Sequence, residues 1–221
     1  MPLSGQTRLQ LTNRVLTRLR EETVATTSST LYAALVAATL DVVKTEIENA
    51  HRWLDLRDTY IVTTTPGVSS YVLTGSGAHA QVLDAWNTTE QVEMSLGTFR
   101  DFNNKFFGTN SVQTGAPTMY LPAGLDASYD KQIDIWPVPT TTNTLKFNVY
   151  APQAALSTDS TVPLVPNDVL VEGTISRLLA ERGDDNGTQV QMQEGLYQKL
   201  LGDAISIELG ADPSEIDWIA D

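Results

Sequence analysis

Two periodicities divide the chain. Apolar residues recur at intervals of three and four along residues 7–22 and 31–54, and again after residue 163, which predicts amphipathic helices near both ends. Between these regions, apolar and polar positions alternate over residues 58–152, which predicts strands. We therefore expect an α+β protein in which a mainly antiparallel β domain is inserted between N-terminal and C-terminal helices.

The N-terminal helices differ in length. In the first, leucines recur among arginines, and in the second a continuous apolar stripe predicts a core-facing side. The stripe contains Tyr32, Leu35, Val36, Leu40, Val43, Ile47, Ala50 and Leu54, and the opposite, polar face contains Asp41, Lys44, Glu46 and Glu48. A helix this long needs further helices to cover it.

The C-terminal helices provide that cover. Prolines at residues 163 and 166 mark a helix start, and Leu170, Ile175 and Leu178 give its stripe. Residues 183–187 break this helix, and a last helix covers about residues 188–209. We expect all four helices to pack as one four-helix bundle.

The clearest strand pattern covers residues 131–152. Two alternating runs, 131–139 and 145–152, flank a polar turn at 140–144 and predict a hairpin whose ends are set by prolines. Residues 59–64 and 70–74 predict a second hairpin. Further predicted pieces are a strand at 91–96 with its apolar residues on one face, a short helix at 99–107 and an extended segment at 118–122.

These patterns set the expected domains and leave a C-terminal tail. We expect a helical domain from residues 1–57 and 163–210, an inserted β domain at 58–162 and a tail at 211–221. A solvated tail has no need for Ile216, Trp218 and Ile219, because each contributes about 1.5 to 3 kcal/mol only when a pocket receives it. We expect the tail to dock on a neighbouring subunit or a partner; the alternative is that it folds back on its own helices.

Composition narrows the class of protein. The 221 residues are 41% apolar, enough for a real core, and they include no cysteine, which suits synthesis in a reducing cytoplasm. The N-terminus lacks an apolar signal region, and no apolar run reaches the roughly 20 residues of a membrane span. We expect a protein that is neither exported by a standard signal nor embedded in a membrane.

Charge is strongly negative and unevenly distributed. The formal net charge is -13 and the isoelectric point about 4.4, which argues against binding nucleic acid through its phosphates. Arg8, Arg14, Arg18 and Arg20 cluster in the first helix, whereas the sequence after Lys199 has no Lys or Arg. Opposite charges at the two ends favour contact between copies or with a basic partner; a solvated tail is the alternative.

Motifs that carry chemistry are weak. Residues 75–80 match G-x-G-x-x-A after a strand, but no long helix pattern follows, so a loop end is favoured over a dinucleotide site. Neither His51 nor His79 has a second ligand at the spacing of a metal site. Ser76, His79 and Asp84 are the residue types of a catalytic triad, but closeness in sequence does not give triad geometry. Asp184 and Asp185 indicate a solvated turn. We expect no catalytic, cofactor or metal site, and therefore no enzyme.

The order of features resembles a known family. Trp53-Leu54 ends the helical pair and is followed by strand signals around 71–73, 116–120, 133–139 and 145–152, then by Val162-Pro163-Leu164-Val165-Pro166 and a helix ending at 178–184. Together, over about residues 7–205, this resembles the head-to-tail adaptor proteins of tailed bacteriophages, which include gatekeeper and tail tubular A proteins.

The resemblance implies a structural role in the virion, at the head-tail interface. It implies a ring, usually of twelve copies, that binds the portal protein, offers a platform to a tail or nozzle protein and lets DNA pass without sequence-specific binding. It also implies which residues meet partners. The residues expected to dock on the portal or a neighbour are Ile216, Asp217, Trp218, Ile219 and Asp221. The residues expected on a tail-facing hairpin are Ile133, Ile135, Trp136, Phe147 and Tyr150. The alternative is a tail-associated binding module that uses its β domain for recognition.

Overall fold

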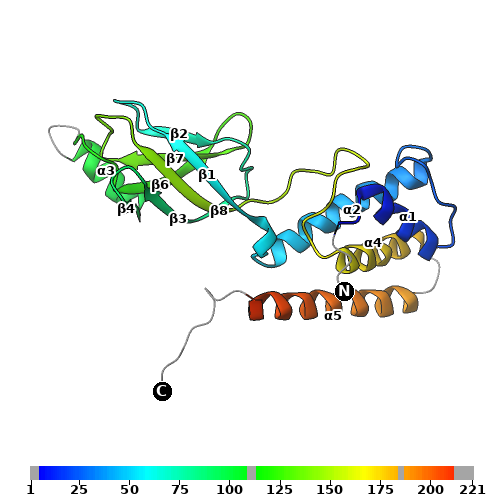
Figure 1. Cartoon of the computed structure of the whole chain (residues 1–221). Coiled ribbons are helices and arrows are strands. Elements are labelled where there is room, and N and C mark those ends of the chain that lie inside the picture. Colours follow the sequence, from blue (N-terminus) through cyan, green and yellow to red (C-terminus); the bar gives the residue numbers. More distant parts are fainter. Residues whose placement is uncertain (1–4, 109–112, 184–186, 212–221) are drawn as a thin grey trace, which may run out of the picture. The chain divides into compact units, whose positions relative to one another are not determined.

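The computed structural model describes residues 5–108, 113–183 and 187–211 (Figure 1). The chain divides into two compact units, one made of residues 1–55 and 153–221 and the other of residues 56–152. The first contains long helices, and the second contains all the named strands and helix α3, Phe99–Phe107. The predicted α+β class is therefore confirmed.

The N-terminal helices begin at side-chain caps. Helix α1 covers Arg8–Arg18, and Thr7 caps it: the Thr7 hydroxyl accepts from Gln10 N, and the Gln10 side chain accepts from Thr7 N. Helix α2 covers Leu31–Ala50 and begins where the Thr30 hydroxyl accepts from Ala33 N. It ends before the predicted residue 54, and a 3-10 turn, η1, follows at Leu54–Leu56.

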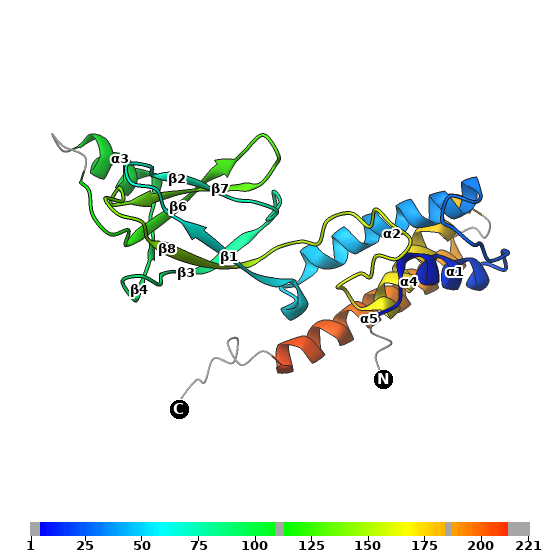
Figure 2. The same cartoon turned by 45° about the horizontal axis from the view of Figure 1, so that its top comes forward.

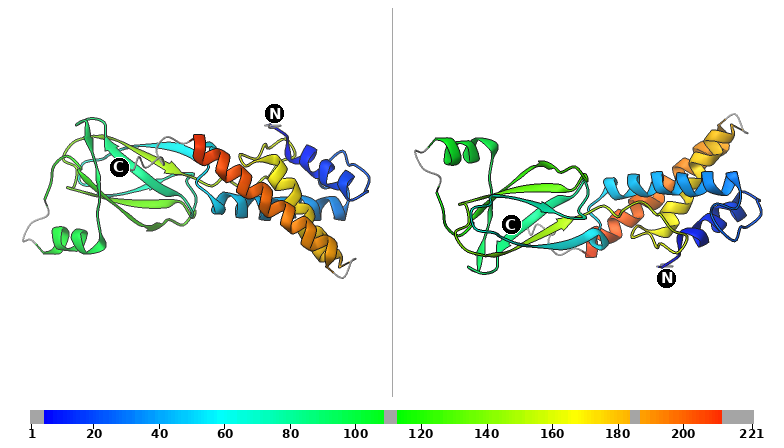
Figure 3. Two further views of the ribbon diagram at one scale, coloured as in Figure 1. Left: turned by 90° about the horizontal axis from the view of Figure 1, so that it is seen from below. Right: turned by 90° about the horizontal axis from the view of Figure 1, so that it is seen from above.

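Helix α4 lies at the centre of the helical unit. It covers Asn167–Arg182, contacts α1, α2 and α5, and ends at Gly183, whose φ of 68° is the left-handed cap that glycine adopts without strain. Helix α5 covers Thr188–Ala211. Figures 2 and 3 show α5 next to α4, on which it packs, and of residues 188–210 Tyr197 alone is buried. Helix α5 therefore lies on the outside of its unit.

One pair of charges on α2 is not where the sequence predicted it. Lys44 and Glu48 were expected on the polar face, but both are buried. Lys44 Nζ donates to both Glu48 carboxylate oxygens at 2.9 Å and to the Gln153 carbonyl at 2.7 Å, and Glu48 accepts from Gln153 N. The periodicity missed this because each charge is compensated by the other and by the backbone of the returning chain.

The strands form two sheets of four. The first has the order β1 (Arg57–Thr63), β8 (Thr144–Tyr150), β3 (Gln81–Asn87), β4 (Val92–Glu93), and the second has the order β2 (Ser70–Leu73), β7 (Lys131–Trp136), β6 (Met119–Leu125), β5 (Ser95–Leu96). Every pair of neighbouring strands is antiparallel except β5 and β6, which are parallel. The prediction of a mainly antiparallel β region is confirmed.

Both predicted hairpins are wrong. Strand β7 pairs with β2 and β6, and β8 pairs with β1 and β3, so the chain changes sheets between residues 136 and 144. The other proposed pair also separates, because β1 and β2 belong to different sheets. Alternation identifies a strand and its buried face, but it is the same whichever strand lies alongside.

The core of the β unit lies between the two sheets. The predicted inward positions Ile133, Ile135, Leu145, Phe147 and Val149 are all fully buried. They pack with side chains from the neighbouring strands: Leu73, Ala85, Met94 and Tyr120. The ring of Tyr120 meets that of Phe147 edge to face with centroids 5.9 Å apart. The predicted alternation is confirmed even though the pairing is not.

Two parts of the β unit differ from the sequence-based prediction. Strand β3 was not predicted, because a bulge between Val82 and Asp84 interrupts its alternation. The strand predicted at 91–96 is divided between the two sheets as β4 and β5, and of its apolar residues Met94 is buried while Val92 and Leu96 are exposed. The short helix predicted at 99–107 is confirmed as α3.

Candidate functional site

The glycine-rich loop after β2 is closed by the chain's own carboxylate. Asp130 accepts from the backbone N–H of Gly75 at 2.8 Å and of Gly77 at 3.0 Å, and these two bonds lower the pKa of Asp130. The Ser76 hydroxyl accepts from Lys131 N. The amides that a phosphate would need already have a partner, so this loop ties β2 to β7, as the loop interpretation expected.

The histidines do not assemble a site. The His51 ring packs edge to face against Trp53, with centroids 5.3 Å apart, and Trp53 Nε1 donates to the Ile47 carbonyl. Within residues 5–108, 113–183 and 187–211, no three His, Asp or Glu side chains come together in a way that could hold a metal ion.

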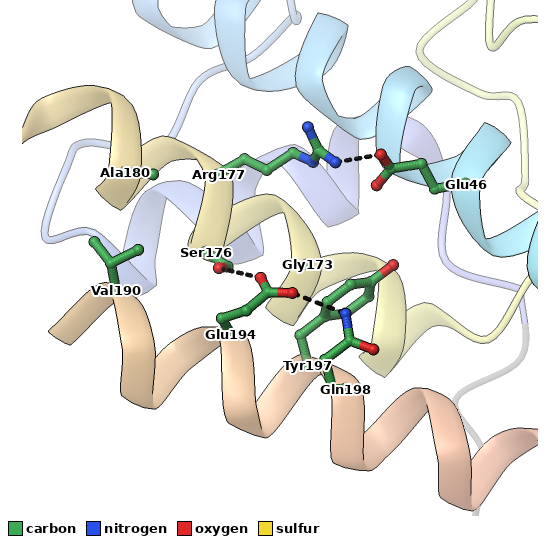
Figure 4. Close-up of a pocket in the computed structure, with 9 residues that line it drawn as sticks. All are labelled: Glu46, Gly173, Ser176, Arg177, Ala180, Val190, Glu194, Tyr197 and Gln198. Carbon is green, nitrogen blue, oxygen red and sulfur yellow. Dashed lines mark hydrogen bonds and ion pairs between the residues drawn. The ribbon is translucent and has the colours of Figure 1, made fainter. Parts of the chain in front are cut away.

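A hollow of about 370 Å³ lies between α2, α4 and α5 (Figure 4). Gly173, Ala180 and Val190 contribute apolar lining. The polar side chains around it satisfy one another: Arg177 pairs with Glu46, and the Ser176 hydroxyl and the Gln198 amide each donate to Glu194 at 2.8 Å. Every charge in the hollow thus has an opposite or hydrogen-bonded partner, which is an arrangement for packing helices rather than for chemistry.

Tyr197 fixes α5 beside this hollow. Its ring lies against Gly173, where an added Cβ would come within 2.7 Å of both Tyr197 Cε2 and Val43 Cγ1. Burial and the nearby carboxylates of Glu46 and Glu194 raise the pKa of the Tyr197 hydroxyl, which therefore stays neutral. Gly173 allows α4 to approach Tyr197 and α2 closely.

The basic cluster of α1 is largely used inside its own unit. Arg8 donates to Asp41 at 3.1 Å, Arg14 to Asp168 at 2.5 Å and Arg18 to Glu172 at 2.7 Å. Of the four clustered arginines, three therefore meet carboxylates of the same chain. The charge pattern that favoured contact between opposite ends of two copies mainly serves to hold α1 on α2 and α4.

The helical unit instead leaves apolar surface uncovered on α2 and α5. On α2, every exposed residue between 31 and 42 is apolar. On α5, large apolar side chains other than the buried Tyr197 face solvent. The exposed fractions are 94% for Leu31, 38% for Leu35 and 52% for Val42 on α2, and 73% for Met192, 39% for Leu196 and 73% for Ile207 on α5. These two faces are the candidate interaction surfaces of the helical unit.

Sequence reasoning missed these faces, although a signal was present. Leu31, Ala34 and Ala38 widen the apolar part of α2 beyond one stripe, and a helix that is apolar around much of its circumference needs cover on more than one side. The predicted stripe placed Leu35 in the core, whereas it lies at the edge of the exposed face.

The residues expected to face the tail lie mostly in the interior. Ile133, Ile135 and Phe147 are buried between the sheets. Tyr150 is buried too, and its hydroxyl accepts from Arg57 Nε and Nη2. Trp136 is half-buried beneath Lys105, whose Nζ lies 3.7 Å from the ring centroid. A partner of this unit would meet other side chains first.

The residues expected to dock on the portal or a neighbour are Ile216, Asp217, Trp218, Ile219 and Asp221. They lie outside the described residues. Their role stays a prediction.

Two further findings concern membrane helices and related proteins. In the part of the chain that the structure describes, no helix is both long enough and apolar enough to cross a membrane. No curated protein matches the sequence. A family model, that of the SU10 adaptor protein, matches residues 6–215. The match covers both units and confirms the resemblance to phage head-to-tail adaptors, and the chain belongs to the SU10 adaptor protein family.

Proposed function

We propose that the protein is a structural connector that forms a ring between the portal and the tail of a phage. The helical unit builds the ring, and the β unit, residues 56–152, faces the tail or nozzle protein. The ring holds twelve copies and extends the DNA channel from the portal. The family match supports the adaptor role.

The observation that carries the ring is the pair of uncovered apolar faces. They occupy α2 and α5, which both pack on α4. A subunit with two different apolar faces on separate helices can assemble head to tail, and such contacts give closed rings when the rotation closes. The β unit buries its core between its own two sheets, and its exposed large apolar side chains are spread over several strands and α3 rather than along one helix.

The net charge of -13 supports a channel rather than a DNA-binding surface. Negative charge repels the phosphate backbone, so DNA passes such a wall without adhering to it. Three arginines of the basic N-terminal cluster, Arg8, Arg14 and Arg18, are also engaged with carboxylates of the same chain.

The C-terminal segment, residues 211–221, completes the proposal as a docking tail. Pro213 disfavours continuation of α5, and Trp218 with its flanking isoleucines supplies an apolar anchor among acidic residues. An aromatic anchor in a partner's pocket is a common source of binding energy at interfaces. We assign this anchor to the portal.

The decisive experiment mixes the protein with the portal protein of the same phage. Light scattering and negative-stain imaging should show a ring of the protein stacked on the portal ring. A chain lacking residues 212–221 should melt like the full chain but give at least a tenfold weaker complex. A full-length protein that stays monomeric beside an intact portal and binds a carbohydrate or peptide would overturn the proposal in favour of a tail-associated binding module.

A further inference from the structure

We propose that the exposed face of α2 in one copy docks on the exposed face of α5 in the next copy. This inference rests on the proposed ring and names the surfaces that build it. The α2 face consists of Leu31, Ala34, Leu35, Ala38 and Val42, and the α5 face consists of Met192, Gly195, Leu196, Lys199, Gly202, Asp203 and Ile207.

The α2 face is a straight apolar stripe. Leu31, Leu35, Ala38 and Val42 follow one another at intervals of four, three and four residues, which places them on one side of the helix over about 17 Å. The nearest acidic side chain, Asp41, is turned toward Arg8 and Leu156 N. The stripe therefore offers apolar surface without a competing charge.

The α5 face points away from α4. At about 100° per residue, Met192, Leu196 and Ile207 fall within about 60° of one another. Tyr197, which packs on α4, lies well outside this arc. Helices α2 and α5 contain 20 and 24 residues, or about 30 and 36 Å, so their faces can align over several turns.

The two faces match in relief. Leu35 and Val42 are large and stand seven residues apart on α2, and Gly195 and Gly202 stand seven residues apart on α5. The space above both glycines is open. Glycine within an exposed helix costs about 1 kcal/mol relative to alanine, and a neighbouring helix that inserts side chains there would offset the cost. Two knobs thus meet two gaps of equal spacing.

The charge of the two faces is compatible with a second copy as the occupant. Two chains of net charge -13 repel each other, so contact between them is least costly where charge is absent or balanced. The α2 face carries no charged side chain, and the α5 face carries one positive and one negative residue, Lys199 and Asp203. Because the two faces differ and belong to separate helices, each copy can use both at once.

Site-specific cross-linking tests this pairing directly, because the natural chain has no cysteine. One set of copies carries Leu35→Cys or Val42→Cys, and the other carries Met192→Cys, Leu196→Cys or Ile207→Cys. A short bis-maleimide linker is added to each variant alone and to mixtures, in each case assembled on the portal. Ile61→Cys on β1, a position 69% exposed, serves as the matched control.

Mixtures of an α2 variant with an α5 variant should give cross-linked dimers in at least tenfold excess over either variant alone or over the Ile61 control. A chain carrying both cysteines should give a ladder of oligomers. Cross-linking of Leu35→Cys copies with themselves would overturn the inference, because it shows that like faces meet. A normal ring without cross-links in any mixture would overturn it as well and leave the proposed function standing. Absence of a ring from the unsubstituted protein would overturn both.

A second measurement covers variants that disturb folding. Copies with Leu35→Glu and Val42→Glu should lose ring formation while keeping the unsubstituted helix content by circular dichroism. When mixed with copies carrying Met192→Glu and Leu196→Glu, they should form dimers through their remaining intact faces. Failure of folded variants to form these dimers would overturn the pairing.

Discussion

The two units of this protein use their apolar residues differently. In the β unit, the inward side chains of both sheets meet one another, and Ile133, Leu145 and Phe147 are fully buried. In the helical unit, α4 is covered on several sides, but α2 and α5 keep large apolar side chains in solvent. The difference lies in arrangement: the exposed apolar side chains of the β unit, such as Ile61, Leu96 and Phe107, are spread over several strands and α3, whereas those of α2 and α5 follow single helices that a neighbour could cover.

The two units also differ in where their structural charged side chains lie. The helical unit buries the Lys44–Glu48 pair and uses it to hold the backbone of Gln153. The core cluster of the β unit is made of apolar and aromatic side chains, and its structural carboxylate, Asp130, works at a loop. Four substitutions test this contrast.

The largest effect is expected for Phe147→Ala in the β unit. Removing a fully buried ring from a core closed on itself should cost about 3 to 5 kcal/mol, because the two sheets cannot collapse around the cavity. Urea unfolding followed by circular dichroism measures it. The control, Ile61→Ala on the exposed face of β1, should stay within about 0.5 kcal/mol. Equal costs for the two changes would contradict the picture of a closed core.

Lys44→Met tests the buried pair of the helical unit and should cost about 3 kcal/mol at neutral pH, because Glu48 is left buried without its partner. Burial already raises the pKa of Glu48. A raised carboxyl pKa means that protonation favours the folded state, so the cost should shrink as the pH falls through that raised pKa and level off below the ordinary value of about 4.3. Urea midpoints of the variant and the parent across the acidic range measure this. A cost independent of pH would show that Glu48 does not govern it.

Gly173→Ala should cost about 1 to 3 kcal/mol, because the added methyl lies 2.7 Å from Tyr197 and Val43 and forces α5 outward. The matched control is Gly202→Ala on the same unit, which meets nothing within 4 Å. It should stabilise the free chain by up to about 1 kcal/mol through helix propensity. Thermal melting of both variants measures the pair, and a loss of stability in Gly202→Ala would be against the open surface described for α5.

The smallest effect is expected for Asp130→Asn. The amides of Gly75 and Gly77 hold the pKa of Asp130 below its usual value, so the contribution of this carboxylate is present above the ordinary pKa of about 3.9 and is lost as the pH falls through the lowered one. The parent should therefore lose stability on acidification more steeply than the asparagine variant. Urea midpoints at neutral and acidic pH compare the two proteins. If the midpoint falls equally with pH in both, the Asp130 carboxylate does not stabilise this loop.

Part of the fold was predictable because it depends on local periodicity. Thr7 and Thr30 cap helices close to the predicted starts, Gly183 ends α4, and the alternation of Ile133 with Ile135 and of Leu145 with Phe147 marks buried faces. The family resemblance was also available from the order of these features along the chain, and the family match confirms it.

The candidate surfaces were not predictable from the same information. A helical pattern shows that Leu35 and Val42 are apolar, but whether another element of the chain covers them depends on how α1, α4 and α5 pack. The bulge at Val82 and Asp84 hid β3 for a related reason, since the partner β8 defines the irregularity.

The positions of most helices and strands and their apolar faces could be inferred from the sequence alone, because they follow from the types and spacing of residues along the chain. The family could be inferred in the same way, from the order of these features. Tertiary structure alone decided that β7 and β8 lie in opposite sheets, that Lys44 and Glu48 are buried together, and that α2 and α5 each keep an uncovered face. Strand pairing and burial depend on contacts between residues far apart in sequence, and periodicity contains no information about the partner.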